Sequence, residues 1–216
     1  SAASDVYKRQ GRLQTDTEAF RNWFGDSKVV DAEGKPLVVY HGTADDFGQF
    51  DVNHPNRHDS GWLGKGIYVT TSPDIASSYS NLKAGMAEPN VMPLYVSLKN
   101  PYHATFQDKL RLQMVSHKEG REAGLAAAEQ WTEELKSQGY DGVILEYPAS
   151  QVGESQASKE IVAFDDTQIK SAIGNNGNFD PNDPNILHQS APEGGANAVT
   201  GDLDRVNPAV RDAVEN

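Results

Sequence analysis

The chain has 216 residues, with 31 acidic and 19 basic side chains, a formal net charge of −12 and no cysteine. These numbers exclude a disulfide framework and a thiolate metal site, and the negative charge disfavours a polyanionic partner. No segment approaches the roughly 18 consecutive apolar residues of a membrane span, and no secretory signal is visible, so we expect no membrane partner.

Composition predicts three parts along the chain. We expect residues 1–14 to be a non-native or disordered N-terminus, residues 15–187 to form one domain, and residues 188–216 to be a flexible tail or linker. Pro, Gly, Asn and Asp are dense beyond Gly174, and such segments favour turns and solvated coil over packed structure.

The first half of the chain predicts two helices and three short strands. Thr15, three residues before Glu18, indicates a capping box at the first helix, and Ser72 is a suitable N-cap for the second. β-branched and aromatic residues mark the strands. The expected elements are helices over 15–24 and 72–82, strands over 28–31, 36–40 and 67–71, and a loop over 41–63.

The second half predicts a long helical tract between short strands. Gly120 or Gly124 is expected to break this tract, because glycine is a poor helix former. The expected elements are strands over 91–98, 143–145 and 160–164, the helical tract over 106–137, and a short element over 167–173. Six or so short strands with scattered helices predict an α+β domain and exclude a Rossmann arrangement.

Three polar positions stand out, although each also has an ordinary structural explanation. His41 ends an apolar run, Tyr68 follows the glycine-rich segment 64–66, and Glu160 opens a late strand. A histidine at a strand end is most often a polar terminus, a strand tyrosine belongs to the core, and a glutamate at a strand edge is solvated. The glycine-rich segment lacks the terminal Lys-Ser/Thr of a phosphate-binding loop.

Taken together, these segments carry a family resemblance. His41-Gly42-Thr43, Gly64-Lys65-Gly66-Ile67-Tyr68 and Lys159-Glu160-Ile161-Val162 resemble the His-Tyr-Glu signature of ADP-ribosyltransferases. The resemblance spans about residues 20–187 and is closest to domains embedded in the polyvalent proteins of phages and mobile elements. It implies a split β-sandwich of two small sheets with flanking helices, and NAD bound as co-substrate in the cleft between the sheets.

The resemblance also implies a role for each residue. His41, Tyr68 and Glu160 would be catalytic, and NAD would be bound by His41, Gly42, Thr43, Tyr68 and Tyr79. His41 would bond the adenosine ribose, the Gly42 backbone would hold the nicotinamide amide with support from the Thr43 hydroxyl, and the two tyrosines would flank the nicotinamide ring. Glu160 would bond the nicotinamide ribose and stabilise the developing positive charge.

Two departures from the family pattern and one requirement of the carboxylate accompany these roles. Ala76 replaces a serine that many polymerase-type members use to bond the carboxamide. Ser158 stands where arginine-specific members carry a second acid, which makes arginine a less favoured acceptor. A carboxylate that must stay ionised needs hydrogen-bond donors, and we expect Lys159 or Ser158 to supply them.

The predicted function is mono-ADP-ribosylation of a macromolecular acceptor, with protein favoured over nucleic acid. The expected setting is the cytoplasm of a bacterial host, reached by phage expression or from the virion, with the isolated domain a monomer. NAD glycohydrolase activity and a catalytically inactive structural module remain as alternatives. No metal site is expected, because Pro55 argues against a helix that would present His54 and His58 together.

Overall fold

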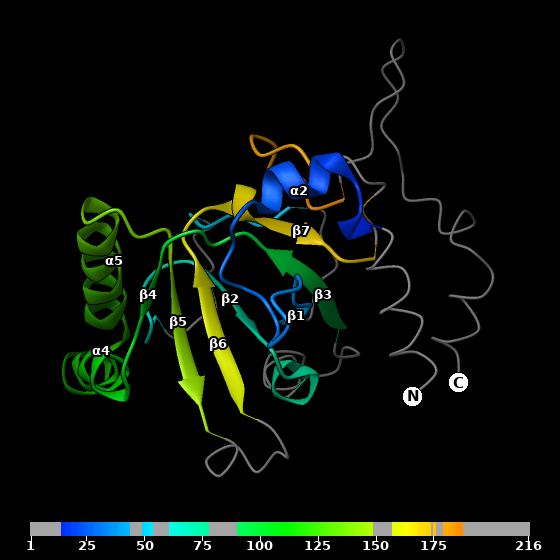
Figure 1. Ribbon diagram of the computed structural model, residues 1–216. Coiled ribbons are helices and arrows are strands. Elements are labelled where there is room, and N and C mark those ends of the chain that lie inside the picture. The colour runs from blue at the N-terminus through cyan, green and yellow to red at the C-terminus, as the bar shows by residue number, and fades with distance from the viewer. Residues whose placement is uncertain are drawn as a thin grey trace.

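The computed structural model describes residues 14–43, 49–53, 61–77, 90–148, 157–173, 175 and 179–187 (Figure 1). Helices and strands alternate irregularly along these residues, which confirms the α+β class. The helices are α2 (Glu18–Phe24), α4 (Phe106–Glu119), α5 (Arg121–Ser137) and the 3-10 helix η1 (Asp166–Gln168). The strands are β1 (Val39–Thr43), β2 (Ile67–Thr70), β3 (Asn90–Val96), β4 (Pro101–His103), β5 (Gly142–Tyr147), β6 (Ser158–Ala163) and β7 (Ile169–Ser171).

The seven strands follow the order β4-β5-β6-β2-β1-β3-β7, and the sheet divides at its β2–β1 junction. There the register contains one pair, Tyr40 with Thr70, whereas β1 pairs with β3 at five positions and β2 with β6 at four. All neighbours are antiparallel except β4 and β5. In Figure 1, β3 and β7 run across the direction of β5 and β6, so the two halves diverge at this junction.

The two halves share one apolar core. Leu94 and Val96 of β3 belong to the same buried cluster as Ile144 of β5 and Ile161 of β6. Tyr95, between the first two, belongs to a different cluster, as the alternation of strand side chains requires. The two expected sheets are therefore the two halves of one hydrogen-bonded sheet, which enclose a common core as in a split β-sandwich.

Helices cover the outer side of each half. Leu112 of α4 and Trp131 of α5 pack against Val143 and Val162 of the β4-β5-β6-β2 half. On the other half, three aromatic residues of α2 pack against Tyr95 and Phe179; they are Phe20, Trp23 and Phe24. Figure 1 shows α4 and α5 together beside β4 and β5, and α2 beside β7.

The described helix boundaries match the expected pattern except at the first cap, and of the helix expected over 72–82 the residues after 77 lie outside the described residues. Gly120 separates α4 from α5 with φ +93, as predicted. Gly124 instead lies inside α5, where an added Cβ would come within 2.6 Å of the Ser116 Cβ, so it permits close packing of the two helices. The cap of α2 is Thr17, not Thr15, because the Thr17 hydroxyl accepts from Phe20 N at 3.1 Å.

Strand boundaries differ more, because pairing partners lie far away in sequence. Residues 41–43 belong to β1 and not to a loop, since β3 pairs with them throughout. The hairpin expected over 28–40 is reduced to an isolated bridge between Val30 and Pro36. Strand β4 was not predicted, although its parallel register with β5 extends the sheet by three residues.

The segment 179–187 is packed, so the expectation of solvated coil is wrong there. Phe179 and Ile186 are 3% and 0% exposed and join two of the core clusters. Lys170 of β7 is fully buried, and its Nζ donates to the carbonyl oxygens of Asp183 and Asn185, at 2.5 and 3.0 Å. Burial lowers the pKa of Lys170, and the nearby carboxyl groups oppose this shift.

Candidate active site

Neighbouring strands carry the three residues of the predicted signature: His41 lies on β1, Tyr68 on β2 and Glu160 on β6. Thr70 of β2 is in register with Tyr40 of β1 on one side and with Glu160 of β6 on the other. Glu160 is also in register with Leu145 of β5. Residues in register on antiparallel strands share a face, so the Glu160 side chain lies on the side that α4 and α5 cover.

The Glu160 carboxylate is held by two donors that the sequence did not reveal. Its Oε2 accepts from Lys109 Nζ of α4 at 2.7 Å and from the Tyr147 hydroxyl of β5 at 2.7 Å. The Lys109 and Glu160 side chains are only 17% and 14% exposed. Salt screens an ion pair with this little solvent contact less than it screens a pair at the surface.

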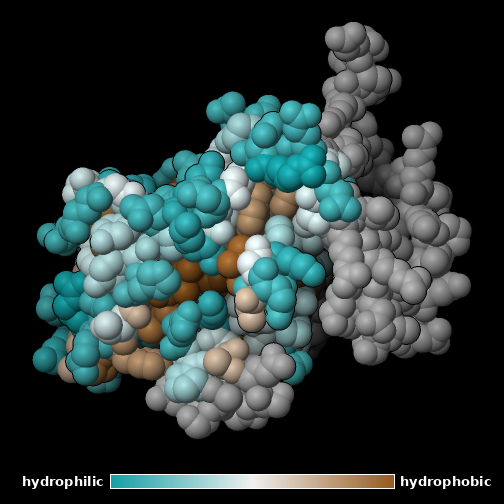
Figure 2. Space-filling model, in the orientation of Figure 1, coloured by the Kyte–Doolittle hydropathy of each residue, from teal (hydrophilic) through white to brown (hydrophobic). Residues whose placement is uncertain are grey.

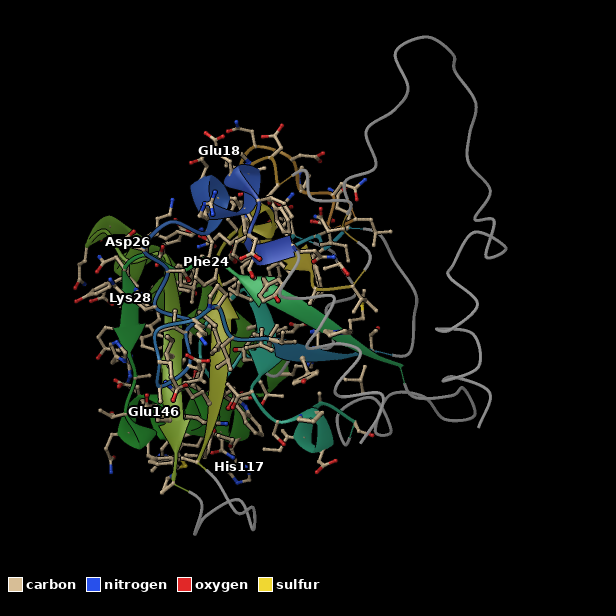
Figure 3. All side chains as sticks on the ribbon, turned by 45° about the vertical axis from the view of Figure 1, so that its right-hand side comes forward. Glu18, Phe24, Asp26, Lys28, His117 and Glu146 are labelled. Carbon is tan, nitrogen blue, oxygen red and sulfur yellow. The ribbon has the colours of Figure 1, made fainter. Side chains whose placement is uncertain are left out.

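Neither donor expected from the sequence reaches Glu160. Lys159 Nζ pairs with Glu146 at 3.0 Å, because neighbouring strand residues point to opposite faces. Figure 3 shows Glu146 toward one end of the sheet, whereas Asp26 and Lys28 lie toward the end beside α2. The Ser158 hydroxyl is buried, and it has no hydrogen-bond partner within the described part of the chain.

The glycine-rich segment before Tyr68 is fixed between α5 and β6. Gly64 has φ +95, and an added Cβ would lie 2.6 Å from Thr132 Oγ1. The same hydroxyl oxygen accepts from Lys65 N at 2.7 Å, and Lys65 Nζ pairs with Glu129 at 2.5 Å. The glycine at 66 allows β6 to approach, since a Cβ there would overlap the Ala163 carbonyl oxygen. These contacts explain the motif as a packing requirement for a loop beside the site.

Tyr68 connects this loop to the strand next to Glu160. Its hydroxyl donates to Gly64 O at 2.6 Å and accepts from Leu63 N at 3.0 Å. The half-buried ring packs against the α4–α5 core cluster, on the same sheet face as Glu160, because Tyr68 is in register with Val162. The hydroxyl therefore orders the loop, and the ring is the part of the side chain suited to contact a flat ligand.

His41 bridges the junction at which the two halves diverge. Its Nδ1 lies 2.7 Å from Tyr68 O, and its ring meets Phe50 edge to face at 5.0 Å between centroids. A carbonyl oxygen only accepts, so Nδ1 carries the hydrogen, and Nε2 of the neutral ring is an acceptor. The contact with the Tyr68 carbonyl oxygen thus selects one tautomer of the neutral His41 ring, and Nε2 of that tautomer is able to accept from a hydroxyl group.

The structure describes some of the remaining residues named in the sequence analysis. Gly42 and Thr43 continue β1 in register with residues 91 and 90 of β3, and Thr43 is 6% exposed. Ala76 is fully buried in the turn of helix after Ser72, whose hydroxyl accepts from Ile75 N at 3.3 Å. Three other residues named in the sequence analysis, Tyr79, His54 and His58, lie outside the described residues.

A comparison with protein families identifies the chain. A model of the family described as ADP-ribosyltransferase in polyvalent proteins matches residues 31–179, which is more than half of the chain. The chain belongs to this ADP-ribosyltransferase family. The match confirms the resemblance to ADP-ribosyltransferases of polyvalent proteins and the fold class, and the matched residues contain the positions of His41, Tyr68 and Glu160, whose roles stay predictions. The comparisons with curated proteins and with solved structures find no match.

The face of this ADP-ribosyltransferase domain seen in Figure 2 is mainly hydrophilic where the residues are described. Figure 2 shows apolar side chains gathered over β5 and β6, with hydrophilic residues around them. Among the described residues, no helix is long and apolar enough to cross a membrane. In the same part of the chain, no group of three or more His, Cys, Asp or Glu could hold a metal ion.

Proposed function

We propose that this domain cleaves NAD at the nicotinamide glycosidic bond and transfers a single ADP-ribose unit to a macromolecular acceptor. The observation that carries the proposal is the Glu160 carboxylate, held by Lys109 and Tyr147 beside the strand that bears Tyr68. A partly buried carboxylate held in one orientation suits the stabilisation of a positively charged transition state. Family membership supports ADP-ribosyltransferase activity in general.

The reaction breaks the bond between C1′ of the ribose and the nicotinamide nitrogen. The bonding electron pair leaves with nicotinamide, which becomes neutral, and positive charge develops on the ribose as in glycoside hydrolysis. In the proposed mechanism Glu160 bonds the 2′-hydroxyl of this ribose and stabilises that charge. The acceptor nucleophile then forms a new bond to C1′ and releases its proton to Glu160, which is proposed to act as the base.

The other residues are proposed to hold NAD in a bent conformation. Nε2 of His41 would accept from the adenosine ribose, and Gly42 would bond the nicotinamide amide through its backbone, with support from the Thr43 hydroxyl. Tyr68 would place its ring against nicotinamide, together with Tyr79. The fixed tautomer of His41 and the buried position of Thr43 support these assignments, because preorganised groups need no rearrangement during reaction.

The acceptor is proposed to be a neutral or anionic group on a host protein. Ser158 replaces the second acid of arginine-specific members, and the positive charge of Lys109 stands 2.7 Å from Glu160. An arginine acceptor would bring a second cation to this carboxylate, at an electrostatic cost. The description of the family as part of polyvalent proteins supports an origin in phages or mobile elements, and with it a host-directed role.

The proposal is tested with NAD labelled in the adenylate moiety. Wild-type protein and Glu160→Gln are incubated with labelled NAD and bacterial lysate, and label is followed on protein, on nucleic acid and as free ADP-ribose. Label on protein, absent with Glu160→Gln, supports transfer. Free ADP-ribose alone identifies a glycohydrolase, and NAD that binds to the wild type without turnover identifies an inactive module.

A further inference from the structure

We propose that Lys109, together with Tyr147, is a positioning residue that anchors Glu160 by one carboxylate oxygen and leaves the other for substrate. This inference rests on the proposed function, because it assigns Glu160 to the reaction. It adds a helix, α4, to an active site that the signature residues place on β1, β2 and β6.

The hydrogen bonds distinguish the two carboxylate oxygens. Lys109 Nζ and the Tyr147 hydroxyl both reach Oε2, and among the described residues no donor is recorded on Oε1. The buried side-chain polar atoms without a partner, over the same residues, are Gln14 Oε1 and Ser158 Oγ. Oε1 of Glu160 also has no donor within this part of the chain but is not one of these buried atoms, so it is accessible to solvent. One oxygen is anchored, and the other is available to a ribose or acceptor hydroxyl.

Lys109 is itself confined by its neighbours. Its Nζ lies 2.5 Å from the Tyr147 hydroxyl, 5.2 Å from the centre of the Tyr147 ring and 6.0 Å from that of Trp62. Trp62 belongs to the loop that precedes Tyr68, and Phe106 of α4 packs edge to face on Tyr147. A lysine surrounded by two aromatic rings and a carboxylate has few alternative rotamers, so it fixes the carboxylate more firmly than a solvated lysine could.

Helix α4, which carries Lys109, is anchored both before and after this residue. Thr105 caps α4, with a capping box in which Asp108 bonds Thr105 N at 2.8 Å. Leu112 is 3% exposed in the α4–α5 core cluster. Lys109 lies between these two anchors, so its backbone is a rigid support. A second, rigid layer of residues is what holds a catalytic group in its productive orientation.

The test compares steady-state NAD turnover in five proteins, with unfolding midpoints measured beside it. These are the wild type, Lys109→Met, Lys109→Arg, Tyr147→Phe and Lys159→Met. Lys159→Met is the matched control, because it removes the neighbouring strand ion pair with Glu146, which points to the other face. We expect kcat to fall roughly 100-fold in Lys109→Met with KM for NAD nearly unchanged, since misplacing a catalytic group by about 1 Å costs this much.

Lys109→Arg should restore most of kcat, because it keeps a cationic donor, and Tyr147→Phe should show a smaller loss than Lys109→Met. If the role of Lys109 were purely structural, Lys109→Met would lower the unfolding midpoint, and Lys109→Arg would not restore kcat. Lys109→Met with wild-type kcat, or with raised KM and unchanged kcat, would overturn the proposal. If the wild type does not turn over NAD, the proposed function is wrong, and this inference, which rests on it, is wrong as well. If the wild type turns over NAD and Lys109→Met does so equally well, only this inference is wrong.

Discussion

Gly66→Ala should destabilise the domain strongly, because β6 lies directly against this residue. The added methyl group would lie 2.5 Å from Val162 Cγ1 and closer still to the carbonyl oxygen of Ala163, against ordinary contacts of 3.4–4 Å. The carbonyl belongs to the strand backbone and cannot rotate away. Overpacking costs about 1–3 kcal/mol, and a clash with backbone places Gly66→Ala near 3 kcal/mol.

Gly34→Ala is the matched control for the same chemical change. Gly34 has φ +77, but nothing lies within 4 Å of an added Cβ, so only backbone strain of about 1–2 kcal/mol is expected. Urea unfolding followed by tryptophan fluorescence measures both variants. At roughly 2–4 °C per kcal/mol, the melting temperature should fall by about 6–12 °C for Gly66→Ala.

Because β6 also carries Glu160, Gly66→Ala should lower NAD turnover at temperatures where it remains folded, whereas Gly34→Ala should not. Equal destabilisation by the two substitutions would refute the argument that close approach of β6 requires glycine at 66. Normal turnover by folded Gly66→Ala would refute the link between this packing and the position of Glu160.

Three further predictions follow from the site and the core. Tyr68→Phe removes the hydroxyl that bonds Gly64 O and Leu63 N, so we expect the free energy of unfolding in urea to fall by about 1–3 kcal/mol. A loss below about 0.5 kcal/mol, roughly the scatter of neutral surface changes, would contradict this. Burial raises the pKa of Tyr95 to about 12 from 10.0, so its protonated hydroxyl contributes stability below pH 10 that is lost as the pH rises through about 12. Tyr95→Phe should therefore lose less stability than the wild type between these pH values in circular dichroism titrations, and parallel curves would argue against it. Agmatine, an arginine analogue, should not accept ADP-ribose from the wild type in a labelled-NAD assay, and an ADP-ribosyl-agmatine product would show that Lys109 does not exclude cationic acceptors.

The parts of the site that the sequence predicted are those encoded by short segments. The glycine-rich turn leads into a strand that carries Tyr68, and Glu160 lies on a late strand, as predicted; the glycines are explained by positive φ or by close approach. Lys109 could not be predicted in this way. It lies 51 residues before Glu160, on a helix where a lysine ordinarily denotes a solvated face.

Non-local pairing accounts for the other differences. Residues 41–43 look like loop because His, Gly and Thr have no strand pattern, yet β3 pairs with all three. Phe179 and Ile186 are isolated apolar residues in a turn-rich segment, and only the three-dimensional core shows where they pack. Expectations for residues 1–13 and 188–216 stay predictions, because these lie outside the described residues.

The proposed function depends on Glu160, which we expect to serve ADP-ribose transfer from NAD. The most direct measurement is the appearance of adenylate-labelled ADP-ribose on protein, for the wild type and Glu160→Gln at equal fold stability and equal NAD binding. We expect labelled protein with the wild type and a loss of at least about 100-fold in rate with Glu160→Gln, the scale of removing one transition-state contact. Equal labelling by the two proteins would contradict it.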